Sequence, residues 1–140
     1  MPGELEAVVR EMYALFDRMD VAGAMRTVAE DAQGVDEISR RWLRGRVEVD
    51  GYMRQLAGAV TGVRSELRDV RETVWGDTGA VTCWLEQDYT MEGQPQHVSA
   101  PTSVVLRRVG GSGEAGSGLG QGGWRIVLFH SIPLPEQPAP

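Results

Sequence analysis

Residues 80–91, AVTCWLEQDYTM, form the clearest strand pattern in the chain, and the fold class follows from reading outward from them. Successive side chains of a strand point to opposite faces of a sheet. One face is largely apolar and consists of Val81, Cys83, Leu85, Tyr89 and Met91. The other face consists of Thr82, Trp84, Glu86, Asp88 and Thr90. This alternation predicts a sheet that covers a core with one face and meets water or a partner with the other.

Turn sequences flank this strand, and further strands are predicted beyond them. GDTG at 76–79 and EGQP at 92–95 are rich in turn-forming residues. Residues 63–75 alternate imperfectly and carry many charges, which is typical of a strand with one face in water. Strands are also predicted at 96–109, where Pro101 implies a bulge or an unpaired amide, and at 124–132. The second half of the chain therefore predicts an antiparallel meander.

The first half of the chain has helical periodicity. An amphipathic helix is predicted from the spacing of Leu5, Val8, Val9, Met12, Phe16 and Met19. Asp20 has the side chain of an N-cap for a second helix, which is expected to end near Glu30. A short β segment at 33–43 and a third helix at 47–60 follow. Helices followed by strands predict an α+β fold, in which three N-terminal helices pack on the concave side of a curved antiparallel sheet and enclose a pocket.

Two segments are expected to lie outside the regular elements. Residues 110–123 consist almost entirely of Gly, Ser, Ala, Glu and Gln, which is the composition of a flexible hairpin loop. Residues 133–140 contain four prolines and predict an extended tail. We therefore predict a single domain over residues 1–132, with the loop inside it and the tail after it.

Composition excludes several kinds of function. The net charge of −6 opposes nucleic-acid binding, and the local cluster Arg40, Arg41, Arg44 and Arg46 is interpreted as a solvated strand edge. The sequence contains no lysine, so neither Schiff-base chemistry nor covalent attachment of pyridoxal phosphate can occur. No cofactor is expected. The single cysteine, Cys83, cannot form an internal disulfide.

The sequence also predicts where the protein resides. The first residues, MPGELE, carry acids and no apolar stretch typical of a signal peptide. No apolar run approaches the roughly 20 residues that a membrane span needs. We therefore expect a cytoplasmic protein without a membrane partner.

Several motifs resemble those of a known group of proteins. VAEDA at 28–32 resembles the "FADDA" element that ends the second helix in the NTF2-like superfamily. LRGR at 43–46, followed by a helix, resembles that group's glycine turn, and WRIVLFHS at 124–131 resembles its closing strand. In this order the motifs are similar to those of SnoaL-like and ketosteroid-isomerase-like members. The resemblance implies a cone-shaped fold around a cavity.

The resemblance also implies candidate catalytic residues. Family isomerases use a carboxylate base after the second helix, while a tyrosine and an acid donate hydrogen bonds to a developing enolate oxygen. The base position falls on Asp36, the tyrosine position on Met12 with Tyr13 beside it, and the acid position on Ser103. Serine is a weaker donor than a neutral carboxylic acid, and a one-residue offset turns a helical side chain by about 100°. Ketosteroid isomerase activity itself is therefore not expected.

His130 and four aromatic residues complete the candidate site. His130 is in phase with Trp124, Ile126 and Leu128 and is interpreted as a core histidine or, if it lines the pocket, as a group that exchanges protons near neutral pH. The candidate ligand-binding residues are Tyr13, Phe16, Trp42 and Tyr52. His97 is expected to be exposed. The two histidines lack metal-ligand spacing, so no metal site is expected.

Two functional hypotheses remain open at this point. The first is a module that binds a small hydrophobic molecule in the cavity, as a homodimer formed through the convex sheet face on which the resemblance places the family's interface. Arg107 and Arg125 could then pair with Glu86 and Asp88 on that face. The alternative is an isomerase or cyclase that acts on a carbonyl-bearing or polycyclic substrate with Asp36 as general base. A non-catalytic interpretation of Asp36 is a loop cap.

Overall fold

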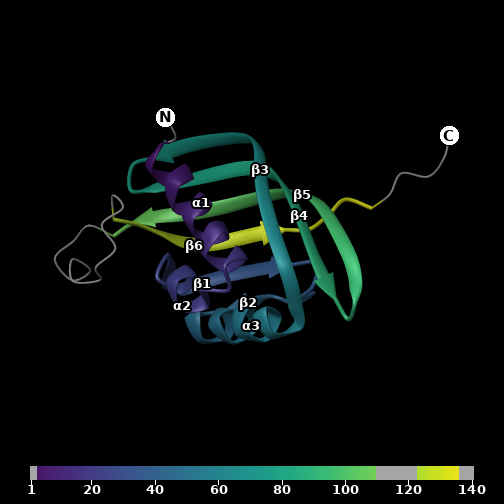
Figure 1. Cartoon of the computed structure of the whole chain (residues 1–140). Coiled ribbons are helices and arrows are strands. Elements are labelled where there is room, and N and C mark those ends of the chain that lie inside the picture. Colours follow the sequence, from purple (N-terminus) through teal and green to yellow (C-terminus); the bar gives the residue numbers. More distant parts are fainter. Residues whose placement is uncertain (1–2, 110–122, 136–140) are drawn as a thin grey trace.

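The computed structural model describes residues 3–109 and 123–135 and shows a bent sheet wrapped around helices (Figure 1). The three helices are α1 (Glu4–Asp17), α2 (Val21–Met25) and α3 (Arg46–Ala59). The six strands are β1 (Val28–Asp36), β2 (Leu43–Arg44), β3 (Val60–Trp75), β4 (Thr78–Met91), β5 (Gln94–Arg108) and β6 (Trp124–Ser131). The predicted glycine-rich loop lies outside the described residues except for Gly123, as does the tail beyond Pro135.

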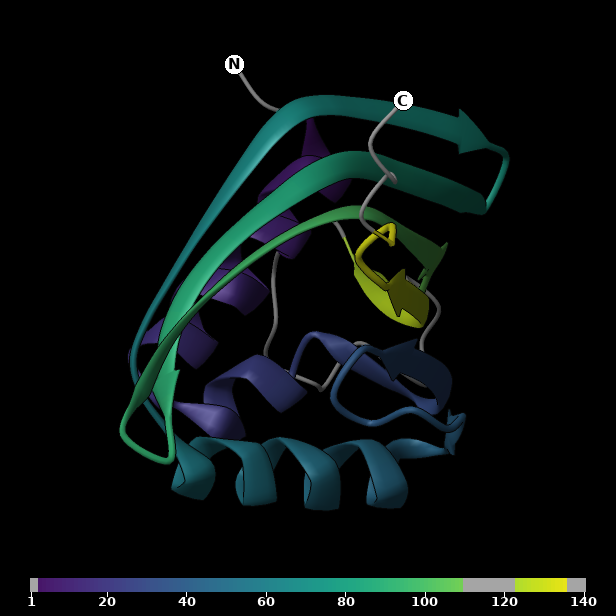
Figure 2. The same cartoon turned by 90° about the vertical axis from the view of Figure 1, so that its right-hand side faces the viewer.

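The predicted α+β fold with three helices on a curved sheet is confirmed. The strand order is β2-β1-β6-β5-β4-β3. Figure 2 shows the long strands β3, β4 and β5 arching over α1, while α3 lies across the opposite side of the molecule. The sheet is mixed rather than wholly antiparallel, because β1 runs parallel to β6. This parallel pairing brings the C-terminal end of β1 beside the C-terminal end of β6, so Asp36 lies opposite Ser131.

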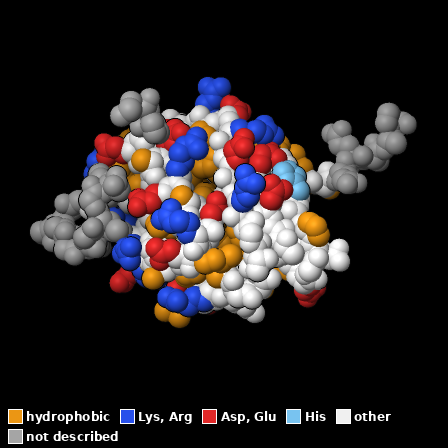
Figure 3. Space-filling model, in the orientation of Figure 1, with side chains coloured by type: hydrophobic (Ala, Val, Ile, Leu, Met, Phe, Trp, Pro, Cys, Tyr) orange, Lys and Arg blue, Asp and Glu red, His pale blue; other side chains and the backbone are white. Residues whose placement is uncertain are grey.

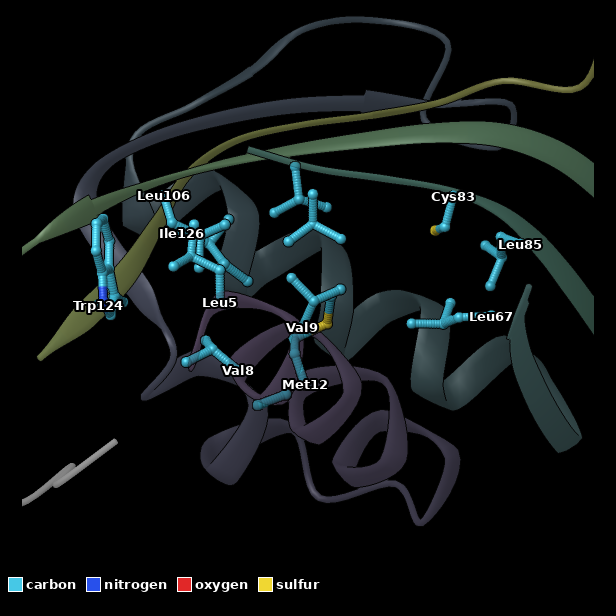
Figure 4. Packing of buried hydrophobic residues seen from close by; sticks show 13 residues of the cluster. Leu5, Val8, Val9, Met12, Leu67, Cys83, Leu85, Leu106, Trp124 and Ile126 are labelled. Atoms are coloured by element: carbon cyan, nitrogen blue, oxygen red, sulfur yellow. The ribbon is translucent and has the colours of Figure 1, made fainter. Parts of the chain in front are cut away.

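The predicted first helix and the apolar face of β4 meet in the core. Leu5, Val8, Val9 and Met12 point from α1 toward the sheet, where they meet Cys83, Leu85, Leu106, Trp124 and Ile126 (Figure 4). The alternation of β4 is confirmed, since Val81, Cys83, Leu85 and Tyr89 are all buried. Met19, in contrast, lies beyond the end of α1 in the left-handed region, with φ of 63°, and is exposed. A residue in that conformation cannot continue a right-handed helix.

The second helix is shorter than predicted. Asp20 does cap it, accepting a hydrogen bond from the Gly23 amide at 2.9 Å. The helix ends at Met25, however, and residues 28–36 form a strand instead of extending the helix toward Glu30. The Ile126 amide donates to the Thr27 carbonyl at 2.8 Å, where β6 joins β1. Pairing with β6 therefore outweighs the local helical pattern of VAE, as tertiary context often does.

Of the two alternatives predicted for Pro101, a bulge or an unpaired position, the structure shows the second. It lies opposite Trp84 in an unbroken register between β4 and β5. On the other side of β5, pairing with β6 begins only at Thr102, which lies opposite Ser131. Pro101 thus occupies a position with no β6 residue opposite it, where the missing N–H costs no ladder hydrogen bond. No bulge is needed at this residue.

The charged side chains on the face seen in Figure 1 are of mixed sign. Figure 3 shows acidic and basic groups interspersed over this face rather than gathered into separate areas. Among the described residues, no helix is long and apolar enough to cross a membrane.

Candidate functional site

A small cavity lies between α1, α3 and the inner face of the sheet. Its volume is about 90 Å³. The helices contribute Met12, Tyr13, Phe16, Val49, Tyr52, Met53 and Leu56, and the sheet contributes Val28, Leu85, Ile126 and Phe129. The lining is mostly apolar, and the polar groups Asp36, Glu37, Gln87 and Ser131 complete it. Typical ligand pockets measure roughly 300–1,000 Å³, so a polycyclic ligand requires side chains to move.

Local sequence explains how α3 faces this cavity. Its lining residues Val49, Tyr52, Met53 and Leu56 are spaced by three and four positions, which places them on one side of a helix. Gly45, immediately before the helix, has φ of +85°. Because side chains are disfavoured there, glycine lets the chain turn sharply from β2 into α3. The LRGR motif therefore sets the direction of the helix that carries Tyr52.

Asp36 occupies the end of β1 and is held by several donors. The Tyr52 hydroxyl lies 2.7 Å from Oδ1 and 2.9 Å from Oδ2 of Asp36. The amides of Ile38 and Ser39 donate to Oδ1 at 3.1 and 2.8 Å. The Asp36 amide in turn donates to the Ser39 hydroxyl at 3.1 Å. This carboxylate therefore caps the following turn and also anchors a tyrosine from α3 at the cavity wall.

Glu37, the next residue, was not identified from the sequence and also lines the cavity. Burial raises the pKa of its carboxyl to about 7, against a lowering by the hydrogen bond from the Glu37 backbone amide, and the neighbouring Asp36 carboxylate adds a smaller rise. Both carboxylates also line a depression of about 470 Å³ that opens beside Arg40, Ile132 and Pro133. The one available signal was its position next to the candidate base.

The tyrosines around this pair remain protonated at ordinary pH. Burial raises the pKa of Tyr13 and of Tyr52 well above the usual range, and the negative charge of Asp36 contributes in both. Burial also raises the pKa of Tyr89, with smaller contributions from Glu37 and Asp36. Each tyrosine is therefore a hydrogen-bond donor rather than a base. Tyr13, Phe16 and Tyr52 all line the cavity, and their contact with a ligand stays a prediction.

The structure does not bring His130 and Ser103 together with Asp36. They lie opposite each other on β6 and β5 and line a groove of about 670 Å³ on the outer face of the sheet, with Trp84, Pro101 and Ile132. His130 is exposed, whereas Phe129 and Ser131 line the inner cavity. A hydrogen-bonded core position for His130, the first interpretation from the sequence, is therefore wrong.

A bulge explains why the sequence misplaces His130. β6 pairs Ile126 with Leu106 and Leu128 with Val105, so Val127 has no counterpart on β5. One extra residue reverses the alternation of every later side chain. Ile126 therefore faces inward, while Leu128 and His130 belong to the opposite face from the one that simple alternation predicts.

Trp42 also lies away from the cavity. Its side chain is 44% exposed. Its ring centroid lies 6.5 Å from that of His130, and the Arg44 guanidinium lies 5.9 Å from the Trp42 ring. Trp42 therefore belongs to the rim of the outer face, and its predicted place in the cavity lining is wrong.

The acidic groups on the outer face have other partners than predicted. Arg107 forms a bidentate pair with Asp31, with both distances 3.0 Å, and Arg125 is buried beside the Trp124 carbonyl. Glu86 instead accepts from Arg68 at 2.9 Å and from Ser99 at 2.8 Å.

His97, exposed as expected, joins the same group of side chains. Its ring nitrogens lie 2.7 Å from Asp88 and 3.1 Å from Glu86. These contacts raise the pKa of His97, while the hydrogen bond from Ser99, followed by those from Arg68 and His97, lowers the pKa of Glu86. Across residues 3–109 and 123–135, no three His, Cys, Asp or Glu side chains are grouped as a metal site.

The bent six-stranded sheet around three helices is an NTF2-like fold. The SnoaL-like domain model matches residues 5–135, and the chain therefore belongs to the SnoaL-like family. No curated protein matches the sequence.

Solved structures share the fold at low sequence identity. An NTF2-like superfamily protein from Salmonella enterica is 15% identical, with 96% of this chain and 92% of that chain covered and a TM-score of 0.80. A ketosteroid isomerase-like protein from Erwinia carotovora is 16% identical, with 94% of each chain covered and a TM-score of 0.72. An NTF2-like protein with a cystatin-like fold from Novosphingobium aromaticivorans is 18% identical, with 96% and 82% covered and a TM-score of 0.72.

Proposed function

We propose that the protein binds a small, neutral, mostly apolar molecule in the cavity between α1, α3 and the sheet. One observation carries the proposal: an apolar lining with a hydrogen-bonded Asp36–Tyr52 pair in its wall. Ligand sites typically combine such a lining with a few fixed polar groups that orient the ligand. The volume of about 90 Å³ favours a ligand of one or two rings, with some movement of the lining side chains.

The test uses 1-indanone, a bicyclic ketone, as the probe. Binding is measured by calorimetry and by the rise in melting temperature that mass action requires. Val49→Phe, which fills the cavity from a buried position, is expected to abolish binding. Val47→Phe makes the same change on the same helix at a side chain that is 86% exposed, and it should bind as the wild type does.

Overpacking costs about 1–3 kcal/mol, so Val49→Phe has its own risk of unfolding. Leu56→Trp, at a partly buried position in the cavity lining, is the second blocking variant. Binding that survives in every folded blocking variant, or a wild type that binds no 1-indanone, would contradict the proposal.

The second candidate function is an enzyme that moves a proton within the bound ligand. It is favoured by the carboxylates at the cavity, one of which occupies the position where the family resemblance implies a general base. The measurement is exchange of the α-hydrogens of 1-indanone with deuterium in D2O. Asp36→Asn, the variant for the predicted base, should bind the ketone and lose the exchange if Asp36 has this role.

A homodimer formed through the outer sheet face is also proposed, and a cytoplasmic location stays a prediction. The groove on that face contains apolar side chains, including Trp84, Pro101 and Leu134, and Leu134 is 64% exposed. Light scattering coupled to gel filtration should give twice the chain mass. Trp84→Arg should give the single-chain mass, and an unchanged dimer in this variant would place the interface elsewhere.

A further inference from the structure

The two adjacent carboxylates at the cavity differ in how many donors hold them. Asp36 accepts from the Tyr52 hydroxyl and from two backbone amides. Its acceptor capacity is therefore largely used within the protein. Glu37 lines the same cavity, and its own backbone amide is the only hydrogen-bond donor to its carboxylate among the described residues; no described side chain donates to it or forms an ion pair with it. A proton acceptor must have a free lone pair within reach of the ligand, and Glu37 meets that condition better.

We infer that Glu37 is the group that exchanges a proton with the bound ligand, and that Asp36 is a positioning residue that holds the Tyr52 hydroxyl. This inference rests on the proposed cavity function and moves the base role by one residue. Glu37 lines both the inner cavity and the outer depression beside Arg40. It can therefore take a proton from a ligand on one side and release it to water on the other.

The surroundings of Glu37 set the pH at which it acts. The charged and titratable groups around it are Asp36 on β1, Tyr13 on α1, Tyr52 on α3, Tyr89 on β4 and Arg40 in the following turn. Burial raises its pKa to about 7, against the hydrogen bond from its own backbone amide and with a smaller rise from the Asp36 charge. A base with a pKa near the working pH combines a substantial ionised fraction with strong proton affinity.

The step that this geometry supports is abstraction of a proton next to a carbonyl. The C–H bond breaks, its proton forms the O–H bond of Glu37, and the electron pair moves onto the carbonyl oxygen. Tyr13, whose hydroxyl has no hydrogen bond to another described residue, is the available donor to that oxygen. Return of the same proton to another carbon completes an isomerisation without a further reactant.

The same charges narrow the ligand class. Negative charge from the carboxylates at one cavity disfavours a ligand that is itself an anion, because like charges repel. Together with the proposed proton abstraction, this narrows the ligand to a ketone or enone without an anionic group and with an acidic C–H next to the carbonyl.

The first experiment needs no ligand. The protein is labelled with 13C at the glutamate carboxyls, and their chemical shifts are followed against pH. One carboxyl should titrate near pH 7, and its signal should be absent in Glu37→Gln. Glu30→Gln, at an exposed position, should remove a different signal. If every glutamate titrates at its ordinary pKa, the inference is overturned.

The second experiment measures base catalysis with 5-nitrobenzisoxazole. A base removes its ring C–H proton, the C–H electrons complete a nitrile, and the N–O bond breaks, so the ring opens to a single coloured phenolate that carries the nitrile. The wild-type rate should rise with pH to half its maximum near pH 7. Glu37→Gln should lower it at least tenfold, whereas Asp36→Asn should keep the inflection near pH 7. Tyr13→Phe should leave that inflection in place.

The outcomes separate this inference from the proposed function. Binding of 1-indanone together with equal rates for the wild type and Glu37→Gln overturns the role of Glu37 alone. An inflection lost in Asp36→Asn and kept in Glu37→Gln returns the base role to Asp36. Failure of 1-indanone to bind overturns the proposed function, while the carboxyl titration still decides whether Glu37 holds its proton near neutral pH.

Discussion

Glu37 and Glu86 are the same residue type in opposite surroundings. Glu37 lines the inner cavity and has no side-chain donor, and burial raises the pKa of its carboxyl. Glu86 lies on the outer face, where Ser99, Arg68 and His97 surround its carboxylate and lower its pKa. Burial in the turn after β1 thus keeps a proton on Glu37 near neutral pH, whereas hydrogen bonds on the outer face of the sheet keep Glu86 ionised.

The largest loss of stability is expected when the Asp36 carboxylate, which accepts the hydrogen bond from Tyr52, is removed. Asp36→Ala leaves the Tyr52 hydroxyl and the amides of Ile38 and Ser39 without their acceptor. Each unsatisfied buried group costs about 1–3 kcal/mol, and partial access to water lowers the sum. We expect a loss of about 3 kcal/mol in urea denaturation at pH 7. A matched change on the outer face, Asp88→Ala, should cost under about 1 kcal/mol, and equal losses would contradict this comparison.

Replacing Glu37 is expected to change the free energy of unfolding by an intermediate amount and to stabilise the protein rather than destabilise it. Its folded-state pKa of about 7 lies above the ordinary value of 4.5. Stability is therefore fully present below pH 4.5 and is lost as the pH rises through about 7. The full difference corresponds to about 3 kcal/mol, and partial exposure reduces the expected effect to about 1–2 kcal/mol.

Glu37→Gln removes that loss, so it should stabilise the protein at pH 8 and have little effect at pH 4. Urea denaturation at the two pH values measures the difference. Glu30→Gln serves as the exposed control. A Glu37→Gln variant that is equally stable relative to the wild type at both pH values would show that the inner face does not raise this pKa.

The smallest change in stability is expected for Glu86, on the outer face of the sheet. The lowered pKa of Glu86 means that its ionised form contributes stability above its ordinary pKa and that this contribution is lost as the pH falls below it. Glu86→Gln should slightly lower the melting temperature at pH 7 in low salt. Because its partners Arg68 and His97 are exposed, 1 M NaCl should reduce the difference, whereas the hydrogen bond from Ser99 is not screened by salt. A difference that is unchanged in 1 M NaCl would show that the ion pairs contribute nothing to it.

The sequence predicts the elements with strong, regular patterns. The apolar stripe from Leu5 to Phe16 predicts α1, and the alternation around Val81 and Leu85 predicts β4. Both patterns arise because one face of the element is buried. Asp20 also predicted its cap correctly. Residues 28–30 were misassigned because their strand conformation depends on β6, nearly one hundred positions later. No local pattern contains that partner.

Some residues of the candidate site could likewise be predicted from the sequence, and others could not. Asp36 could be placed from its position after the VAEDA motif, and Tyr13, Phe16 and Tyr52 from helices expected to face a cavity. His130 could not be placed, because the bulge at Val127 arises from how β5 and β6 pair. Glu37 was missed because its pKa depends on what covers it.

By itself, the sequence determined the helix and strand periods, the acidic net charge and the absence of lysine, since each of these is a property of residue type and order. Only the tertiary structure decided which face His130 occupies and which of two adjacent carboxylates has fewer hydrogen-bond donors. Solvent exclusion and hydrogen-bond supply depend on neighbours that are distant in the chain, and they set the pKa of Glu37.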